Sequence, residues 1–469
     1  MTRGSFAPPD SRRARSLLCV SALVLPAAGL AACSSSGGPA PTVSARVTGS
    51  PSSVAKACTP TWSTDAIPLP PGSQSGGESG AADLLVANFF TIQSLSAVST
   101  SDIWAAGQSV VGATQTGQAL VEHWNGAAWS IVPVQHAGDS DMDWDRSEDL
   151  TSVDAISSND AWAVGFYPAN RPAGDVPSTV NVLTLVEHWN GTAWSIVPAP
   201  DATKSDNLNS VSGDSSNDVW AVGGATYGLA YGAGSGAGTM SYDAPLVEHW
   251  NGSTWTIVPA PTIGLDPHNP AALAKVAAGL ASGADENPAS ADFTSVHAIS
   301  PDDVWAVGIR SFTNPDQETY TGDQTFTEHW DGTKWSVVAA PDVTVPETSS
   351  SAEDDLQAVT GSDGDVWAVG RAQPIGTLVL HWNGTAWSIL PSPQTGENGV
   401  LETVADLAPN NVWAAGDEID HWNGQTWSQI PTINGSAIQT ITAMAAVSSN
   451  DIWFADVNDF IHYGCSPAS

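Results

Sequence analysis

Short runs of apolar and polar positions recur in a fixed order along most of the chain. Before Trp162, apolar residues lie at Leu150, Val153 and Ile156, and a polar Ser-Asn-Asp turn follows them. The next runs read Trp-Ala-Val-Gly and Leu-Val-Glu-His-Trp, and an Asn-Gly pair leads into a fourth run, Trp-Ser-Ile-Val-Pro. Such runs between turn residues predict β-strands. Asn-Gly predicts a two-residue type I′ hairpin, and proline ends the fourth strand because it has no N–H to donate.

Tryptophan marks three positions in each of these four-stranded units. The first is Trp104, Trp162, Trp220, Trp305, Trp367, Trp413 and Trp453. The second follows a His, at Trp124, Trp189, Trp250, Trp330, Trp382 and Trp422. The third comes five residues later, at Trp129, Trp194, Trp255, Trp335, Trp387 and Trp427. Internal repetition of four-stranded units is typical of propellers. We therefore predict an all-β, seven-bladed β-propeller of four-stranded blades.

The seventh unit has no fourth strand of its own. It runs through Trp453 to Cys465, and the chain ends four residues later. Near the other end, Cys58-Thr-Pro-Thr-Trp62-Ser matches the Gly-Thr-Ala-Trp-Ser of the other units. We therefore expect this N-terminal strand to complete the last blade of a propeller spanning residues 58–469. Cys58 and Cys465 then fall where the Asn-Gly turn would be, and we predict a disulfide between them.

The first residues read as an export signal. A basic stretch with Arg12, Arg13 and Arg15 precedes an apolar segment from 17 to 30 that is too short for a stable membrane span. The segment ends in Leu-Ala-Ala-Cys33, which resembles a bacterial lipobox, although an ordinary secretory signal is the alternative. We predict a lipoprotein signal peptide over 1–32 and a lipidated Cys33. A flexible Ser/Gly/Pro tether over 33–57 would hold the protein on the extracytoplasmic side of the cell membrane.

Composition narrows the range of partners. The chain has 469 residues, 13 Lys and Arg against 49 Asp and Glu, and a formal net charge of −36. This balance argues against nucleic acid, which needs clustered cations. The negative charge also argues against binding of the protein body to an anionic membrane surface, so the lipid anchor is the expected contact with the membrane. We expect a monomer that recognises a protein or a cell-envelope polymer.

The Trp-Ala-Val-Gly and His-Trp-Asn-Gly-x-x-Trp units resemble those of exported bacterial β-propellers related to the kelch and galactose-oxidase central-domain type. Their Asn-Gly hairpin also resembles the Asp-box turn of sialidase-like propellers. The resemblance covers residues 58 to 465. It implies a propeller fold and says little about activity, because one fold hosts many functions. Galactose-oxidase chemistry is not expected, because both cysteines of the body are assigned to the disulfide.

Seven His residues share one register, which raises the question of a metal site. They are His123, His188, His249, His329, His381, His421 and His462. The strand that carries them lies away from the propeller axis, so equivalent atoms of different blades are far apart. We therefore favour a hydrogen-bonded structural histidine in each blade over a metal ligand.

Long, variable connections predict where a ligand binds. They follow the second and fourth strands of the blades, and both types emerge on one face of a propeller. On that face we expect an acidic arc just before the innermost strands, formed by Asp149, Asn207, Asp292 and Asp355. Four arginines lie in or beside the same connections: Arg146, Arg171, Arg310 and Arg371.

An alternating acidic run lies near this face. Asp139, Asp141, Asp143 and Asp145 resemble a calcium loop, but Trp144 stands where an EF-hand needs Gly. Bound Ca²⁺ is one interpretation, and solvated carboxylates that keep the protein soluble are the other. No further cofactor is expected.

Two functions remain open for the loop-rich acidic face. One is a binding or scaffold module, which we favour. The other is a glycan hydrolase or lyase that uses loop carboxylates and arginines. We favour a protein without catalytic activity. The four arginines occupy different positions relative to the repeat in their blades, whereas a cluster that binds a carboxylate would require matching positions.

Overall fold

The computed structural model describes residues 60–68, 89–110, 117–137, 147–168, 181–231, 238–261, 290–314, 319–343, 352–373, 375–393 and 399–464. The chain divides into two compact units, Met1–Ala57 and Cys58–Ser469. Every described residue belongs to the second unit. Within these ranges we find strands and turns, and no helix of a length and hydropathy that would cross a bilayer.

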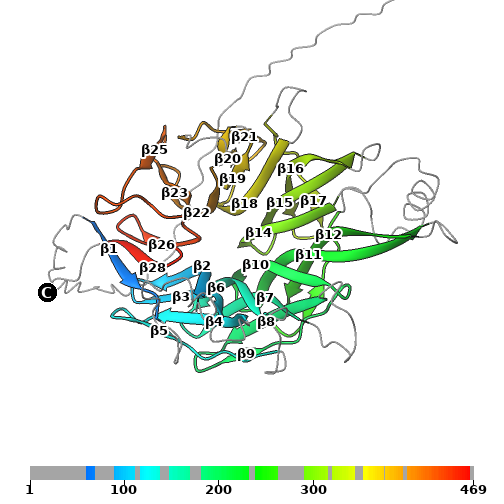
Figure 1. The fold of residues 1–469 in the computed structure, drawn as a ribbon, viewed down its shortest axis with the longest axis horizontal. Coiled ribbons are helices and arrows are strands. Elements are labelled where there is room, and N and C mark those ends of the chain that lie inside the picture. Colours follow the sequence, from blue (N-terminus) through cyan, green and yellow to red (C-terminus); the bar gives the residue numbers. More distant parts are fainter. Residues whose placement is uncertain are drawn as a thin grey trace, which may run out of the picture. The chain divides into compact units, whose positions relative to one another are not determined.

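The described strands form seven blades of four strands each (Figure 1). The first blade contains β2 (Phe89–Ser99), β3 (Asp102–Val110), β4 (Gly117–Trp124) and β5 (Trp129–Ile131). The second contains β6 (Asp149–Ser157), β7 (Asp160–Pro168), β8 (Val182–Trp189) and β9 (Trp194–Ile196). The third contains β10 (Asp206–Ser215), β11 (Asp218–Tyr231), β12 (Gly238–Trp250) and β13 (Trp255–Ile257).

The remaining blades follow the same order along the chain. The fourth contains β14 (Ser290–Ser300), β15 (Asp303–Asn314), β16 (Thr319–Trp330) and β17 (Trp335–Val337). The fifth contains β18 (Ala352–Ser362), β19 (Asp365–Ala372), β20 (Gly376–Trp382) and β21 (Trp387–Ile389). The sixth contains β22 (Leu401–Ala408), β23 (Asn411–Gly416), β24 (Ile419–Trp422) and β25 (Trp427–Ile430). The seventh combines β26 (Ala443–Ser448), β27 (Asp451–Ala455) and β28 (Asp459–Gly464) with β1 (Thr61–Ala66).

The first strand of each blade is the innermost one. Residues from β2, β6, β10, β14, β18, β22 and β26 together line a central cavity of about 160 Å³. Adjacent strands within each blade pair antiparallel. The prediction of seven four-stranded blades around one axis is confirmed.

The last blade borrows its outer strand from the start of the propeller. Strand β1 pairs antiparallel with β28, and Trp62 lies opposite Tyr463. The rings of these two residues are 4.9 Å apart. The predicted closure is confirmed, because hydrogen bonds between the two ends of the propeller seal the ring. Cys58 and Cys465 lie outside the described residues, so the disulfide stays a prediction.

The hairpin between the third and fourth strands differs from the predicted type I′ turn. Four residues form the connection in the first blade, and among them Gly126 has positive φ (87°) whereas Asn125 does not. The Asn125 side-chain oxygen instead accepts hydrogen bonds from the backbone N–H groups of Ala127 and Ala128 (3.0 and 3.1 Å). This side-chain turn needs an acceptor and not a left-handed residue. Asp331 replaces Asn in the fourth blade and makes the same bonds.

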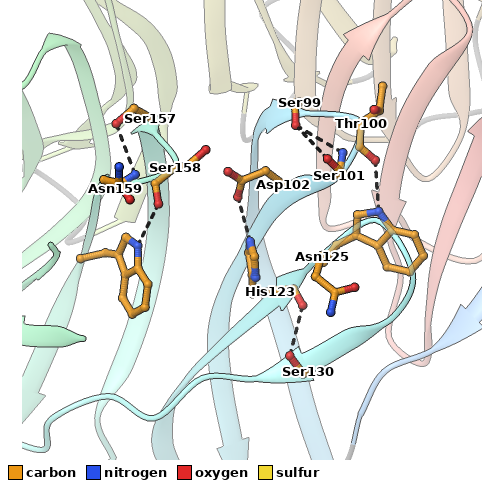
Figure 2. A network of polar contacts seen from close by, with 12 residues as sticks. Ser99, Thr100, Ser101, Asp102, His123, Asn125, Ser130, Ser157, Ser158 and Asn159 are labelled. Carbon is orange, nitrogen blue, oxygen red and sulfur yellow. Dashed lines mark hydrogen bonds and ion pairs between the residues drawn. The ribbon is translucent and has the colours of Figure 1, made fainter. Parts of the chain in front are cut away.

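The repeated His is a structural residue in every blade. Figure 2 shows His123 beside Asp102 in the first blade, with Nε2 and Oδ1 2.8 Å apart. The other blades repeat this bond at 2.5 to 2.9 Å, with Asn411 as the acceptor for His421. Each His also packs on the first Trp of its own blade, with ring centroids 4.2 to 4.5 Å apart. The structural interpretation of these histidines is confirmed.

Indoles fill the spaces between neighbouring blades. Trp162 of the second blade contacts Trp250 and Trp255 of the third, at 5.0 and 5.3 Å between ring centroids. In five blades the Trp of the third strand donates its indole N–H to the turn between the first two strands of its own blade, as Trp124 does to the Thr100 carbonyl (3.2 Å). Because the first and third Trp of blades one to six are large and buried, these contacts fix blade against blade.

Candidate functional site

A β-bulge near the start of the innermost strand shapes the mouth of the central cavity. In the second blade the register shifts between Leu150 and Ser152, which leaves Thr151 unpaired with β7. The bulge fits because Gly165 lies opposite. A Cβ on that glycine would come within 1.9 Å of the Asp149 carbonyl oxygen. This close approach explains the Gly of Trp-Ala-Val-Gly, because only glycine leaves the space.

The bulged residue of each blade lines the central cavity. In blades one to six these residues are Gln93, Thr151, Asn209, Thr294, Gln357 and Glu402, and Thr442 holds the corresponding place in the seventh. In the seventh blade Asp456 stands at the glycine position, and β27 ends before it. A ring of seven polar side chains therefore surrounds the cavity.

The threonines of this ring tie neighbouring blades together. Thr151 donates its hydroxyl to the Leu208 carbonyl of the next blade (2.7 Å), and Thr294 donates to the Leu356 carbonyl (2.6 Å). Thr442 donates to the Ile92 carbonyl (2.5 Å) across the junction between the last and first blades. These three positions are structural, because their hydroxyl groups are used within the ring.

The amides of the ring hold the predicted acidic arc. The Gln93 amide donates to Asp149 (2.6 Å), and the Gln357 amide donates to Asp355 (3.0 Å). Asn209 donates to Asp292 (3.3 Å to Oδ2) and accepts a hydrogen bond from the Asn207 amide (2.7 Å). Each residue of the expected arc is thus hydrogen-bonded to a residue of the ring, but the arrangement differs between blades. Asp149 and Asp292 accept from the preceding blade, whereas Asp355 and Asn207 are bonded to a ring residue of their own blade.

Burial raises the pKa of two carboxyl groups of this arc. It raises the pKa of Asp149 to about 6, partly offset by the hydrogen bond from Gln93. Burial and the nearby charge of Asp243 raise the pKa of Asp292 to about 7. Negative charge at the mouth therefore depends on pH in the range in which cells operate.

Arg371 interacts with acidic residues of the fifth and sixth blades, namely Asp355 and Glu402, and Asp417 lies near enough to Glu402 to affect its charge. Arg371 Nε donates to Asp355 Oδ2 at 2.6 Å. Glu402, which lines the cavity, has a pKa raised by burial first and then by the charges of Asp355 and Asp417, and Arg371 partly offsets these effects. The mouth thus combines a carboxylate held by a guanidinium with a second carboxyl that ionises less readily.

The remaining arginines and the acidic run predicted from the sequence are not part of this hydrogen-bonded arc in the described residues. Arg310 donates to Gln324 on the neighbouring strand (2.6 Å) and lies in β15, opposite Ala291. Arg146, Arg171 and the acidic run of Asp139, Asp141, Asp143 and Asp145 lie outside the described residues, as does Cys33. The ranges that are described contain no group of three His, Cys, Asp or Glu arranged to hold a metal ion. Calcium binding by the acidic run stays a prediction.

Two of the expected loops are largely β-ribbons. Strands β11 and β12 pair as far as Tyr231 opposite Gly238, and β15 and β16 pair as far as Asn314 opposite Thr319 (Figure 1). Both ribbons leave the mouth end of their blades, because Asn207 and Asp292 lie opposite strand positions from which the ribbons continue. Residues 224–244 and 309–324 are the long connections after the second strand of these blades, which the sequence predicts as loops. The prediction is wrong for most of these residues, because pairing between the second and third strands continues beyond the blade.

Sequence reasoning also missed the residues that surround the arc. Asn209 and Gln357 stand two positions after a residue chosen for the arc, and Gln93 and Glu402 stand two positions after its equivalents in the first and sixth blades. Alternation along a strand would place them on the same side of the strand. The polar character of that second position in all seven units was the available signal.

A second missed feature is the Glu of Leu-Val-Glu-His-Trp. Glu122, Glu187, Glu248 and Glu328 are fully buried between blades. Burial raises the pKa of Glu122 and Glu328 to about 8 and that of Glu187 to about 7, and it raises the pKa of Glu248 well above its ordinary value. These carboxyl groups are buried on the third strands and not at the mouth, so they bear on stability more than on binding.

Comparisons with known proteins add no family assignment. No family model matches the chain, and no curated protein matches it. Among solved structures, YCF48 from Cyanidioschyzon merolae is 12% identical, with 86% of this chain and 98% of that chain covered and a TM-score of 0.45. A chain of the mitotic checkpoint complex is 9% identical, with 85% and 98% covered and a TM-score of 0.40. The WD40 β-propeller domain of Doa1 is 12% identical, with 68% and 93% covered and a TM-score of 0.29.

Structural similarity with identities of 9 to 12% and TM-scores of 0.29 to 0.45 does not indicate the function of this protein. The propeller fold itself rests on the seven blades and their pairing. The kelch and galactose-oxidase type, a bacterial origin and the lipid anchor stay predictions from the sequence.

Proposed function

We propose that this protein is an extracytoplasmic binding or scaffold propeller that recognises a protein or a cell-envelope polymer at the mouth of its central cavity. Its acidic, loop-rich face would be the recognition surface. Cys33 would carry the lipid that anchors the protein to the membrane, with residues 33–57 as the tether.

The observation that carries this proposal is the pair of β-ribbons at the mouth end of the third and fourth blades. Their hydrogen bonds continue well past the blade, to Tyr231 and to Asn314. A further parallel pairing joins β16 to β18, with Gly322 opposite Ala352. Ordered backbone outside the blades supports binding of a large partner, because it presents side chains without the entropic cost of ordering a loop.

The charge of the same face supports a choice among partners. Asp149, Asp292, Asp355 and Glu402 lie in the first few residues of the innermost strands of the second, fourth, fifth and sixth blades, and Arg371 donates to Asp355. A partner with basic or hydroxyl groups would complement this surface, whereas a polyanion would be repelled.

Glycan processing is the alternative, and one observation favours it. Glu402 ionises less readily than an ordinary glutamate, because it is buried and lies near Asp355 and Asp417. Asp355 is held by Arg371. Two carboxyl groups in different environments are the usual acid and base of a glycosidase. In this alternative Glu402 would be the acid, and Asp355 the base or nucleophile.

Substitution of the arc separates the two functions. We expect Asp292→Asn with Asp355→Asn to weaken capture of the natural partner at least tenfold, as measured by crosslinking on intact cells and then by binding of the purified pair. In the enzymatic alternative the same variant would abolish turnover of a glycan library by the wild-type protein. Asp331→Asn is the matched control, because Asn stands at that position in most other blades and its turn lies away from the mouth. Wild-type turnover of any glycan would refute the binding proposal.

The anchor has its own test. We expect Cys33→Ser to abolish metabolic labelling with a fatty acid and to move the protein from the membrane fraction to the soluble fraction. An unchanged, labelled membrane fraction would exclude lipidation at this residue.

A further inference from the structure

The outer strand of the seventh blade departs from the outer strands of the other six. Strands β5, β9, β13, β17, β21 and β25 contain three or four residues, whereas β1 contains six. In five of those six blades a proline follows at the fourth position after the Trp, and Ala66 stands at that position in β1. Alanine keeps an N–H that can pair at this position and proline does not, although the fourth blade, which has Ala339 there, still has a three-residue outer strand.

A second difference lies one residue earlier. At the third position after the Trp, the other blades carry an aliphatic side chain that packs against the next blade: Val132, Val197, Val258, Val338, Leu390 and Ile430. In β1 this position is Asp65, and it is exposed. The aliphatic side chain found at this position in the other blades is therefore absent from β1, and Ile67, two residues further along, is buried between the seventh and first blades instead.

A groove of about 740 Å³ lies at this junction. Ser63 and Asp65 of β1 line one side, and the indole of Trp124 lines the other. Asp451, paired with His462, lies in the same groove (2.8 Å between Oδ1 and Nε2). The groove contains two carboxyl groups and no Lys or Arg among its described lining residues.

Within the described part of the chain, the outer edge of β1 pairs with no further strand, and one side chain reaches the backbone of β1, because Asn434 donates a hydrogen bond to the Trp62 carbonyl (3.4 Å). Its one described strand partner is β28, and β1 lies at the end of that sheet, at the rim of the propeller in Figure 1. Thr61, Ser63, Thr64, Asp65 and Ala66 are all exposed. An exposed edge strand of this length is a template for a further strand.

We propose that β1 and this groove form a second binding site, which takes an extended basic peptide segment of a partner protein. The peptide would pair with the open edge of β1, which is a common mode of peptide recognition. Since alternate side chains of a strand point to one side, every second residue of the peptide would face the groove that Ser63 and Asp65 line. A Lys or Arg there would meet the carboxylate of Asp65 and the indole of Trp124.

This site is separate from the mouth. Asp65 belongs to an outermost strand, whereas the arc belongs to the innermost strands. The two proposals can therefore fail independently.

The test uses the full chain and an alternating Val-Lys hexapeptide, with binding measured by fluorescence anisotropy. We expect the Val-Lys peptide to bind at least tenfold more tightly than a Val-Glu peptide, and N-methylation of its alternate amides to abolish binding. Asp65→Val restores the residue type of the other blades and should weaken binding at least tenfold without lowering the melting temperature. Ala66→Pro should do the same if it folds. Thr64→Val, on the opposite face of β1, is the matched control.

Hydrogen exchange identifies the strand that is bound. We expect the outward-facing amides of residues 61–66 to exchange quickly in the free protein and slowly with the peptide. Equal binding of both peptides, or unchanged binding by Asp65→Val, would refute the proposal. Slow exchange of those amides without peptide would also refute it, because the edge would then be covered by another part of the chain or by a second copy.

Discussion

Replacing Gly165 by Ala should destabilise the propeller by about 3 kcal/mol or more. The new Cβ would meet the Asp149 carbonyl oxygen at 1.9 Å, and both groups belong to paired backbone strands. Neither can move without breaking the bulge that places Thr151 at the cavity. Chemical denaturation of the purified variant measures the loss.

A second glycine separates this effect from the general cost of replacing glycine. A Cβ on Gly117 would meet the end of the flexible Gln108 side chain and no backbone atom. We therefore expect Gly117→Ala to cost about 1 kcal/mol or less, mainly through the Gln108 hydrogen bond to the Glu148 carbonyl. Equal losses in the two variants would contradict the explanation of the repeated Trp-Ala-Val-Gly motif.

Replacing Glu328 by Leu should stabilise the protein by about 3 kcal/mol at pH 9. Burial raises the pKa of Glu328 to about 8, while the carboxyl of the unfolded chain titrates near 4.5. Between these values the folded state holds a proton that the unfolded state has lost, so stability falls as the pH rises toward 8. Leu380 stands at the same position in the fifth blade and is also fully buried, so the ring accepts leucine there.

Melting curves from pH 5 to pH 9 measure this effect. The melting temperature of the wild type should fall across the range, and Glu328→Leu should reduce the fall. Glu328→Gln serves as the control, since it keeps a polar group of similar size and removes the charge. A gain in stability from leucine that is the same at pH 5 and pH 9 would show that burial of a polar group, and not ionisation, is responsible.

The candidate site could be predicted only in part. Asp149, Asp292 and Asp355 were found because each stands directly before the first apolar position of the repeat in its innermost strand, and the repeat makes that position visible. Glu402 was missed because the equivalent arc residue in its blade is Val400, which carries no charge. The partners of the arc could not be assigned either, since Gln93 reaches Asp149 from a different blade.

The fold followed from local pattern to a much greater extent. Strand order, blade number and closure of the seventh blade by residues near Trp62 all depend on which runs recur and which run is missing at the end. The connections were harder to predict, because pairing between β11 and β12 continues through a segment of Gly, Ala and Ser with little strand character.

The amino-acid sequence alone determined that this protein is a seven-bladed ring closed by its own N-terminal strand, because each blade is specified by a short repeated pattern of apolar residues and turns. Only the tertiary structure decided which side chains meet at the mouth, which glutamates lose their charge, and where a junction between blades stays open. Those properties depend on burial and on atoms contributed by neighbouring blades, and a repeat read along one chain does not contain them.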